Sequence, residues 1–111
     1  MPHLLQFKFG EIFVCRFPFT SGQLSKPRPA LVLFDVGPDV IICRITSAVL
    51  AGDLNVPVQY WREAGLEKPS IVRLDRLVTA EKPLLIRQIG KLTAADADTI
   101  KSAWNRRMVL R

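Results

Sequence analysis

The sequence predicts a mainly β fold, a small β-barrel with one C-terminal α-helix packed on it. Several short apolar runs are separated by turn residues, which is typical of all-β domains. Only the last segment has clear helical periodicity. The 111 residues, 49% of them hydrophobic, suit one domain over 1–111 with a real core. A domain this small is only modestly stable alone, so dimerisation would help it.

The first three strands are the clearest. The apolar runs Glu11–Phe17, Pro29–Phe34 and Val40–Thr46 each have strand length, and Pro18 ends the first. Gly37-Pro38-Asp39 is a turn sequence because Gly and Pro supply the backbone angles that turns need. The second and third runs are therefore predicted to form a hairpin.

The middle of the chain has weaker signals. We expect further strands over Leu54–Val58, Ser70–Arg73 and Leu84–Ile89. Tyr60–Ala64 is predicted to be a short helical turn that Gly65 closes.

The final helix has a start signal and an apolar face. Thr93 is a good N-cap, and Asp96 suits the positive end of a helix. Apolar residues then recur at helical spacing at Ala97, Ile100, Trp104 and Met108. We interpret Trp104 as a core anchor rather than a binding residue.

Arg28 lies between Pro27 and Pro29 at the entrance of the second strand. Each proline fixes its own φ and favours extended backbone in the residue before it. The segment is either a surface arginine at a proline-rich turn or a rigid group for binding phosphate.

Thr46 ends the third strand. Strand alternation places Arg44 and Thr46 on one side, and Cys43 and Ile45 on the other. Thr46 either caps a backbone group or, if the hairpin places it beside Arg28, forms a site with it. The loop between Thr20 and Arg28 could fold over the same edge.

The net charge of +6 is concentrated in the second half of the chain. Residues 1–55 hold five basic and four acidic groups, whereas residues 56–111 hold eleven basic and six acidic groups. This balance suits a polyanionic partner, either nucleic acid or an acidic peptide.

Several classes of function lack their signals. Cys15 and Cys43 lie in apolar runs outside any CxxC pair, and His3 is the single histidine, so we expect buried core thiols, no metal site and no cofactor. A P-loop is absent. With neither a membrane-spanning apolar run nor a secretory signal, we expect a cytoplasmic protein without membrane association.

An arginine and a hydroxyl can hold a phosphate and stabilise charge developing on its oxygens. RNA carries its own nucleophile, the 2′-hydroxyl, and aligning it with the phosphorus accelerates cleavage by orientation alone. Such a site is suited to internal transesterification of RNA.

Ordered motifs along nearly the whole chain resemble those of the PemK/MazF toxins of bacterial toxin–antitoxin systems. They are Gly10-Glu11-Ile12, Phe17-Pro18-Phe19-Thr20, Lys26-Pro27-Arg28-Pro29-Ala30-Leu31-Val32-Leu33, Cys43-Arg44-Ile45-Thr46-Ser47, Gly65-Leu66-Glu67-Lys68-Pro69-Ser70 and Ile89-Gly90-Lys91-Leu92. The Arg-Pro pair before an apolar strand and the Ile-Thr-Ser strand end are the most specific.

The resemblance implies an SH3-like β-barrel of the CcdB/PemK-like type that acts as a homodimer. It implies a metal-independent, sequence-selective endoribonuclease that cleaves single-stranded RNA to 2′,3′-cyclic phosphate and 5′-hydroxyl ends. The implied partner is a cognate antitoxin whose acidic tail covers the RNA groove.

By the same resemblance, Arg28 and Thr46 match the catalytic arginine and threonine. Because arginine stays protonated, we favour charge stabilisation by Arg28, while Thr46 hydrogen-bonds a non-bridging oxygen. The implied RNA-binding residues are Thr20, Ser21, Lys26, Ser47, Arg73 and Arg76.

Two segments depart from the family pattern. Some members carry a Gly-Ser-Glu-Gln-like loop before the arginine, where this chain has Thr20–Ser25 with Ser21 as the candidate loop serine. Many members have Gln-Val-Arg or Gln-Ile-Arg where this chain has Leu74–Val78. RNA sequence preference is therefore not carried over, and Arg73 and Arg76 either line a groove or are solvated arginines.

Two alternatives use the same fold. One is a non-catalytic toxin that binds DNA gyrase, and the other is an RNA-binding protein without cleavage. A gyrase-binding toxin does not need Arg28 and Thr46 to converge, so their placement discriminates between these hypotheses.

Overall fold

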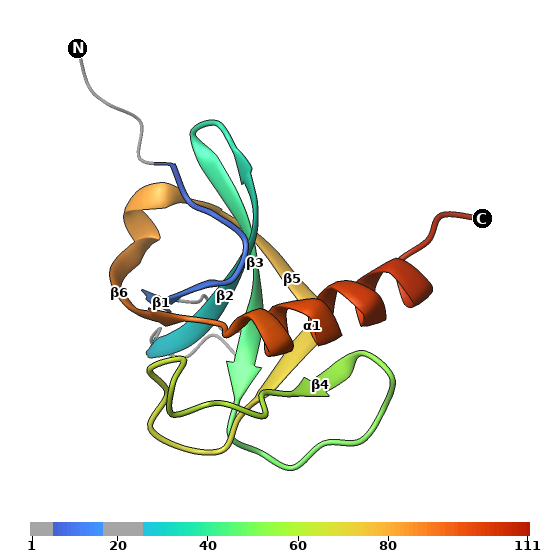
Figure 1. The fold of residues 1–111 in the computed structure, drawn as a ribbon. Coiled ribbons are helices and arrows are strands. Elements are labelled where there is room, and N and C mark those ends of the chain that lie inside the picture. The colour runs from blue at the N-terminus through green and yellow to red at the C-terminus, as the bar shows by residue number, and fades with distance from the viewer. Residues whose placement is uncertain (1–5, 17–25) are drawn as a thin grey trace.

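The computed structural model describes residues 6–16 and 26–111, which form an antiparallel sheet and one long helix (Figure 1). The sheet has six strands in the order β4-β5-β3-β2-β1-β6. The elements are β1 (Glu11–Arg16), β2 (Pro27–Val36), β3 (Asp39–Thr46), β4 (Asn55–Pro57), β5 (Ile71–Glu81), the 3-10 helix η1 (Lys82–Leu84), β6 (Leu85–Lys91) and α1 (Ala94–Arg107).

The mainly β class with a C-terminal helix is confirmed, but the sheet is not a closed barrel. Its edges are β4 and β6, and no ladder joins these two strands in the described residues. β4 is only three residues long and ends in Pro57, which has no N–H to donate to a further strand. Figure 1 shows α1 crossing in front of the sheet, and α1 contacts β4.

The predicted hairpin is formed by β2 and β3, which pair in antiparallel register from Val36↔Asp39 to Ala30↔Arg44. Gly37 supplies the turn with φ +84°, and its N–H donates to Oδ1 of Asp35. The other Asp35 oxygen, Oδ2, accepts the Phe7 N–H and lies 2.9 Å from Nζ of Lys82. The Phe7 hydrogen bond, followed by the Lys82 hydrogen bond, lowers the pKa of Asp35 below its ordinary range.

The prediction for β5 was too short. The expected strand Ser70–Arg73 continues to Glu81, across a break in register between Cys43↔Leu77 and Arg44↔Arg73. The break leaves the residues between Arg73 and Leu77 outside the ladder, which is a β-bulge. The other two predicted middle strands are present as β4 and β6 with shifted bounds.

Helix α1 begins as predicted. The Thr93 hydroxyl oxygen accepts the Asp96 N–H at 3.3 Å, so Thr93 is the N-cap. Asp96 does more than favour the helix start, because its buried carboxylate accepts the N–H groups of Gln59 and Tyr60 at 3.0 and 2.9 Å. The helix is thereby attached to the segment after β4.

That segment contains the predicted helical turn. The Ala64 N–H donates to the Tyr60 carbonyl at 3.1 Å, and Gly65 ends the turn with φ +91°.

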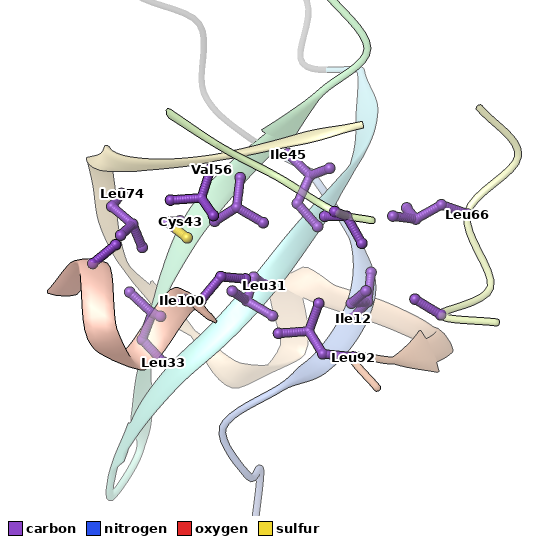
Figure 2. Packing of buried hydrophobic residues seen from close by; sticks show 14 residues of the cluster. Ile12, Leu31, Leu33, Cys43, Ile45, Val56, Leu66, Leu74, Leu92 and Ile100 are labelled. Carbon is purple, nitrogen blue, oxygen red and sulfur yellow. The ribbon is translucent and has the colours of Figure 1, made fainter. Parts of the chain in front are cut away.

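Alternate residues of the central strands enter two separate cores. The first core lies between the sheet and α1, where Leu31, Cys43, Ile45 and Ile100 are almost fully buried (Figure 2). Trp104 packs against this core and makes an edge-to-face contact with Phe34 at 5.6 Å, as expected of an anchor.

The second core occupies the opposite face of the same strands. Its members are Phe7, Phe13, Cys15, Ala30, Val32, Val40, Ile42, Ala80 and Leu85. Because successive residues of a strand point to opposite faces, Arg28 continues the row of Ala30 and Val32. Arg44 and Thr46 likewise continue the row of Ile42, so this face changes from apolar to polar at one end of the sheet.

Both cysteines are core residues, as predicted. Cys15 and Cys43 are buried free thiols. Burial raises the pKa of Cys15 to about 11 and raises the pKa of Cys43 further. Neither thiol is therefore primed as a nucleophile.

Candidate functional site

A groove of about 570 Å³ lies where β2 begins and β3 ends. Arg28, Thr46 and Ser47, three residues that the sequence singles out, line it together. Its other lining residues are Val14, Pro27, Pro29, Arg44, Ile45, Gly65, Leu66, Glu67, Lys68, Ser70, Arg87, Gln88 and Ile89.

Strand pairing explains why Arg28 and Thr46 reach one groove. Ala30 pairs with Arg44, and Arg28 and Thr46 lie two residues further along β2 and β3. Both therefore lie on the face that carries the second core, beyond its last apolar residues. Arg28 also pairs with Cys15 of β1, and this pairing holds its backbone at the edge of the groove.

The Thr46 hydroxyl has a structural partner inside the chain. Its oxygen accepts the Ala48 N–H at 3.2 Å, so Thr46 does cap the end of β3. A hydroxyl that accepts one hydrogen bond still has its own proton to donate. The capping interpretation and the site interpretation are thus compatible, since the cap fixes the hydroxyl that faces the groove.

The opposite wall of the groove depends on two glycines. A Cβ on Gly65 would overlap the Ile89 carbonyl, and a Cβ on Gly90 would overlap the Ala64 carbonyl. Only glycines allow the segment after the Tyr60 turn to lie this close to β6. The two motifs that contain Gly65 and Gly90 in the sequence therefore meet in the structure.

The same wall carries a buried hydroxyl. Ser70 is 9% exposed, and its Oγ donates to the Lys68 carbonyl at 2.7 Å. This bond closes the turn before β5, and both residues line the groove.

The groove is strongly basic. Four cationic side chains line it, those of Arg28, Arg44, Lys68 and Arg87, against the single carboxylate of Glu67 among the lining residues. A cleft with this excess of positive charge concentrates anionic ligands.

Arg44 lies among further arginines. Burial lowers the pKa of its guanidinium, and the positive charges of Arg28, Arg73 and Arg76 lower it further. Arginine remains charged at neutral pH even so.

The remaining predicted binding residues are distributed unevenly. Lys26 is exposed just before β2 and is not a lining residue of the groove. Arg73 pairs with Arg44, and both Arg73 and Arg76 are near enough to lower its pKa, yet neither lines the groove. Thr20 and Ser21 lie outside the described residues.

Sequence reasoning missed six polar groove residues: Arg44, Glu67, Lys68, Ser70, Arg87 and Gln88. Arg44 had a usable signal, because strand alternation already placed it on the side of Thr46. Lys68 and Ser70 lie in a motif that contributed to the family resemblance without a role. Arg87 had no signal, because its position depends on how β6 folds back beside β1.

This arrangement can hold a phosphodiester. A guanidinium offers several donors in a fixed fork, and the Thr46 hydroxyl offers one more. Residues 6–16 and 26–111 contain no group of three or more His, Cys, Asp or Glu side chains placed to bind a metal ion. Nor does any helix in these two ranges have the length and apolar character to cross a membrane.

Comparison with known proteins gives consistent results. Residues 8–106 match the family described as PemK-like, MazF-like toxin of type II toxin–antitoxin system. A search of curated proteins finds no match.

Solved structures share the fold over most of their length. The Mycobacterium tuberculosis toxin MazF-mt6 has a TM-score of 0.74 and 27% identity, covering 91% of this chain and 98% of that chain. An endoribonuclease in complex with its cognate antitoxin, from a mycobacterial species, has a TM-score of 0.76 and 19% identity, covering 93% and 95%. The Deinococcus radiodurans MazE-MazF structure has a TM-score of 0.68 and 16% identity, covering 98% and 100%.

The family match spans most of the chain, and the fold, the groove and the ordered motifs agree with it. The chain therefore belongs to the family of PemK-like, MazF-like toxins of type II toxin–antitoxin systems.

Proposed function

We propose that this toxin is a metal-independent, sequence-selective endoribonuclease that cleaves single-stranded RNA in the basic groove. The main support for the proposal is that Arg28 and Thr46 line one groove together with further cationic side chains. Solved relatives named endoribonuclease are consistent with it.

The reaction is an internal transesterification. The RNA 2′-oxygen attacks the adjacent phosphorus and loses its proton, and the bond from phosphorus to the 5′-oxygen breaks. The leaving 5′-oxygen takes up a proton, so the products carry a 2′,3′-cyclic phosphate and a 5′-hydroxyl.

Arg28 and Thr46 act on the phosphate in this scheme. The Arg28 guanidinium stabilises charge that develops on the non-bridging oxygens. Its backbone is restricted by the two flanking prolines and by pairing with Cys15 of β1. The Thr46 hydroxyl, fixed by the Ala48 N–H, donates to one non-bridging oxygen. The 2′-hydroxyl supplies the nucleophile, so the protein contributes orientation and electrostatic stabilisation.

The convergence of Arg28 and Thr46 favours RNA cleavage over the gyrase-binding alternative, which has no use for it. A protein that binds RNA without cleaving it would need the same groove. A cleavage assay therefore distinguishes this alternative from the proposed enzyme.

We propose a cognate antitoxin and a homodimer as the assembly, in the cytoplasm. Relatives have been solved in complex with antitoxins, including the MazE-MazF structure. An acidic antitoxin segment fits a groove with four cations and one carboxylate.

The test is cleavage of a long single-stranded RNA in EDTA by the wild-type protein and by Arg28→Ala, with the 5′ ends of the products mapped. We expect discrete wild-type cuts that leave 5′-hydroxyl ends. The Arg28→Ala rate should fall by about 100-fold or more, as for loss of one oxyanion-stabilising group.

Arg106→Ala is the matched control, because Arg106 is exposed in the last turn of α1 and does not line the groove. Circular dichroism and the elution mass verify that each variant keeps its fold and assembly. Cleavage by Arg28→Ala at the Arg106→Ala rate would contradict the role of Arg28. Absence of wild-type cleavage would contradict the enzyme itself.

A further inference from the structure

A row of arginines extends from the groove across the sheet. Arg44 of β3 lines the groove and pairs directly with Arg73 of β5. On its other side Arg44 pairs with Ala30 of β2, and Arg28 lies on the same face two residues before Ala30. Directly paired residues present their side chains on one face of a sheet. The groove cations thus continue away from Thr46 along this face.

Like charges placed directly opposite each other destabilise a sheet. Within the described parts of the chain, the ion pairs join Lys82 to Asp35 and Arg107 to Asp53, and no carboxylate pairs with Arg44 or Arg73. The next neighbour in the row is Asn55, which pairs with Arg73 and carries no charge.

Hydrogen bonding in the row is also incomplete. Nε of Arg73 and Oδ1 of Asn55 are buried and have no hydrogen-bond partner in the described structure. Arg73 is thus paired with Arg44 in the sheet, while its buried Nε has no acceptor and no carboxylate of the described residues forms an ion pair with it. A fold that keeps two paired arginines in this state is suited to an external anion.

We infer that Arg44, with Arg73 behind it, forms a second phosphate-binding subsite for the RNA phosphate next to the one that is cleaved. The lowered pKa of Arg44 is consistent with this, since burial and the charges of Arg28, Arg73 and Arg76 cause it. An anion at the subsite would relieve that repulsion.

The inference rests on the proposed function, because the position of the subsite follows from that of Arg28 and Thr46. Diagonal neighbours on adjacent strands are roughly 7–8 Å apart, and Arg28 is the diagonal neighbour of Arg44. One nucleotide of single-stranded backbone can span such a distance. An RNA whose scissile phosphate contacts Arg28 therefore brings a flanking phosphate to Arg44.

The first test compares Arg44→Met with Arg106→Met on an RNA with a mapped cleavage site. Arg44→Met should raise KM by about 10- to 100-fold, the loss expected of a charged hydrogen bond, while kcat stays nearly unchanged. The slope of log affinity against log salt should become shallower by about 0.7, because one phosphate contact is lost. Arg106→Met should match the wild type.

The second test identifies the phosphate. A methylphosphonate at a linkage adjacent to the scissile one removes a single negative charge from the RNA. At one such linkage, the methylphosphonate should weaken binding of the wild type as much as the Arg44→Met substitution weakens binding of unmodified RNA. Arg44→Met should lose little more on the modified RNA, since residue and phosphate then form one interaction.

Binding of a 2′-O-methyl version of the RNA, which cannot be cleaved, separates failure of the subsite from failure of the proposed enzyme. If the wild type fails to cleave RNA, a salt-dependent affinity that weakens specifically in Arg44→Met still supports the subsite on an RNA-binding toxin.

Three results would overturn the inference. One is a fall in kcat with KM unchanged, which would place Arg44 in the chemical step. Another is that, for every methylphosphonate tested, the loss of RNA affinity adds fully to the loss caused by Arg44→Met. The third is unchanged RNA affinity with weaker dimerisation or weaker binding of a poly-glutamate peptide, which would make the row a protein interface.

Discussion

At the scale of single residues, Thr46 combines a structural hydrogen bond with a place in the groove. Its oxygen accepts the Ala48 N–H at 3.2 Å, which consumes an acceptor position and leaves the hydroxyl proton for the groove. The backbone bond thus orients the group that we propose to contact the phosphate.

This dual role gives a prediction for Thr46→Val and Thr46→Ser. Valine removes the hydroxyl at nearly constant shape, so we expect kcat to fall by about 100-fold and the free energy of unfolding to fall by about 1 kcal/mol. Serine keeps both hydrogen bonds and should retain most of the activity. Single-turnover cleavage and urea unfolding measure the two effects.

Thr79→Val is the control, because Thr79 is an exposed strand threonine on β5 outside the groove. If Thr46→Val cleaved RNA as fast as Thr79→Val, Thr46 would be only a structural cap.

Residue-level prediction from the sequence succeeded where the signal was local. The two prolines around Arg28 and the position of Thr46 at a strand end are visible in the chain itself. Arg44 was placed on the correct side by alternation, but its pairing with Arg73 depends on a contact between strands that are distant in sequence. No local pattern reveals that pairing, so the arginine row was missed.

At the scale of elements, the groove wall depends on the close approach of the Ala64–Gly65 backbone to Ile89–Gly90. Gly90 does not need a left-handed backbone, so space alone requires glycine there. Gly37, by contrast, has a left-handed φ but nothing within 4 Å of an added Cβ. A side chain at Gly90 would therefore cause steric overlap, whereas a side chain at Gly37 would cause only backbone strain.

We predict that Gly90→Ala destabilises the fold more than Gly37→Ala does. Overlap with the Ala64 carbonyl forces the backbone to move, at a cost of about 2–3 kcal/mol, whereas the strained turn costs about 1 kcal/mol. Urea unfolding gives both values. Gly90→Ala should also slow RNA cleavage, because Gly65, Leu66 and Ile89 line the groove. Equal stability of the two variants would show that the wall accommodates a side chain.

Element prediction was best where apolar patterning was continuous. The hairpin of β2 and β3 and the capped helix α1 follow from their own residues. β5 was cut short because Asp75 and Arg76 interrupt the apolar pattern at a bulge, although the strand continues to Glu81. The sequence indicated only a helix-start role for Asp96, yet its carboxylate accepts hydrogen bonds from Gln59 and Tyr60, which are 37 and 36 positions earlier in the chain.

At the scale of the whole molecule, one sheet carries two cores and a basic groove. The strands look like uninterrupted apolar runs because both of their faces are buried. The polar residues appear where the second core stops, at the start of β2 and the end of β3. Four of the chain's sixteen basic side chains, against one carboxylate, are thereby brought together in the groove.

The open sheet is the main difference from the expected barrel. A closed barrel would need β4 and β6 to pair, and β4 is too short and ends in Pro57. The sequence indicated strands in this region but carried no signal for which edges meet. The groove does not depend on closure, because β2, β3 and the Gly65–Ser70 segment form most of it.

The central claim, that the groove promotes attack by the RNA 2′-hydroxyl, is tested most directly by one substitution in the substrate. An RNA with a mapped cleavage site is compared with the same RNA carrying a single 2′-deoxy nucleotide immediately 5′ of the scissile bond. Binding and single-turnover cleavage are measured for both in EDTA. Our account predicts that the deoxy substrate binds with similar affinity and is not cut, because it lacks the nucleophile. Continued cleavage at the same bond would contradict the account, because another nucleophile would then attack the phosphate.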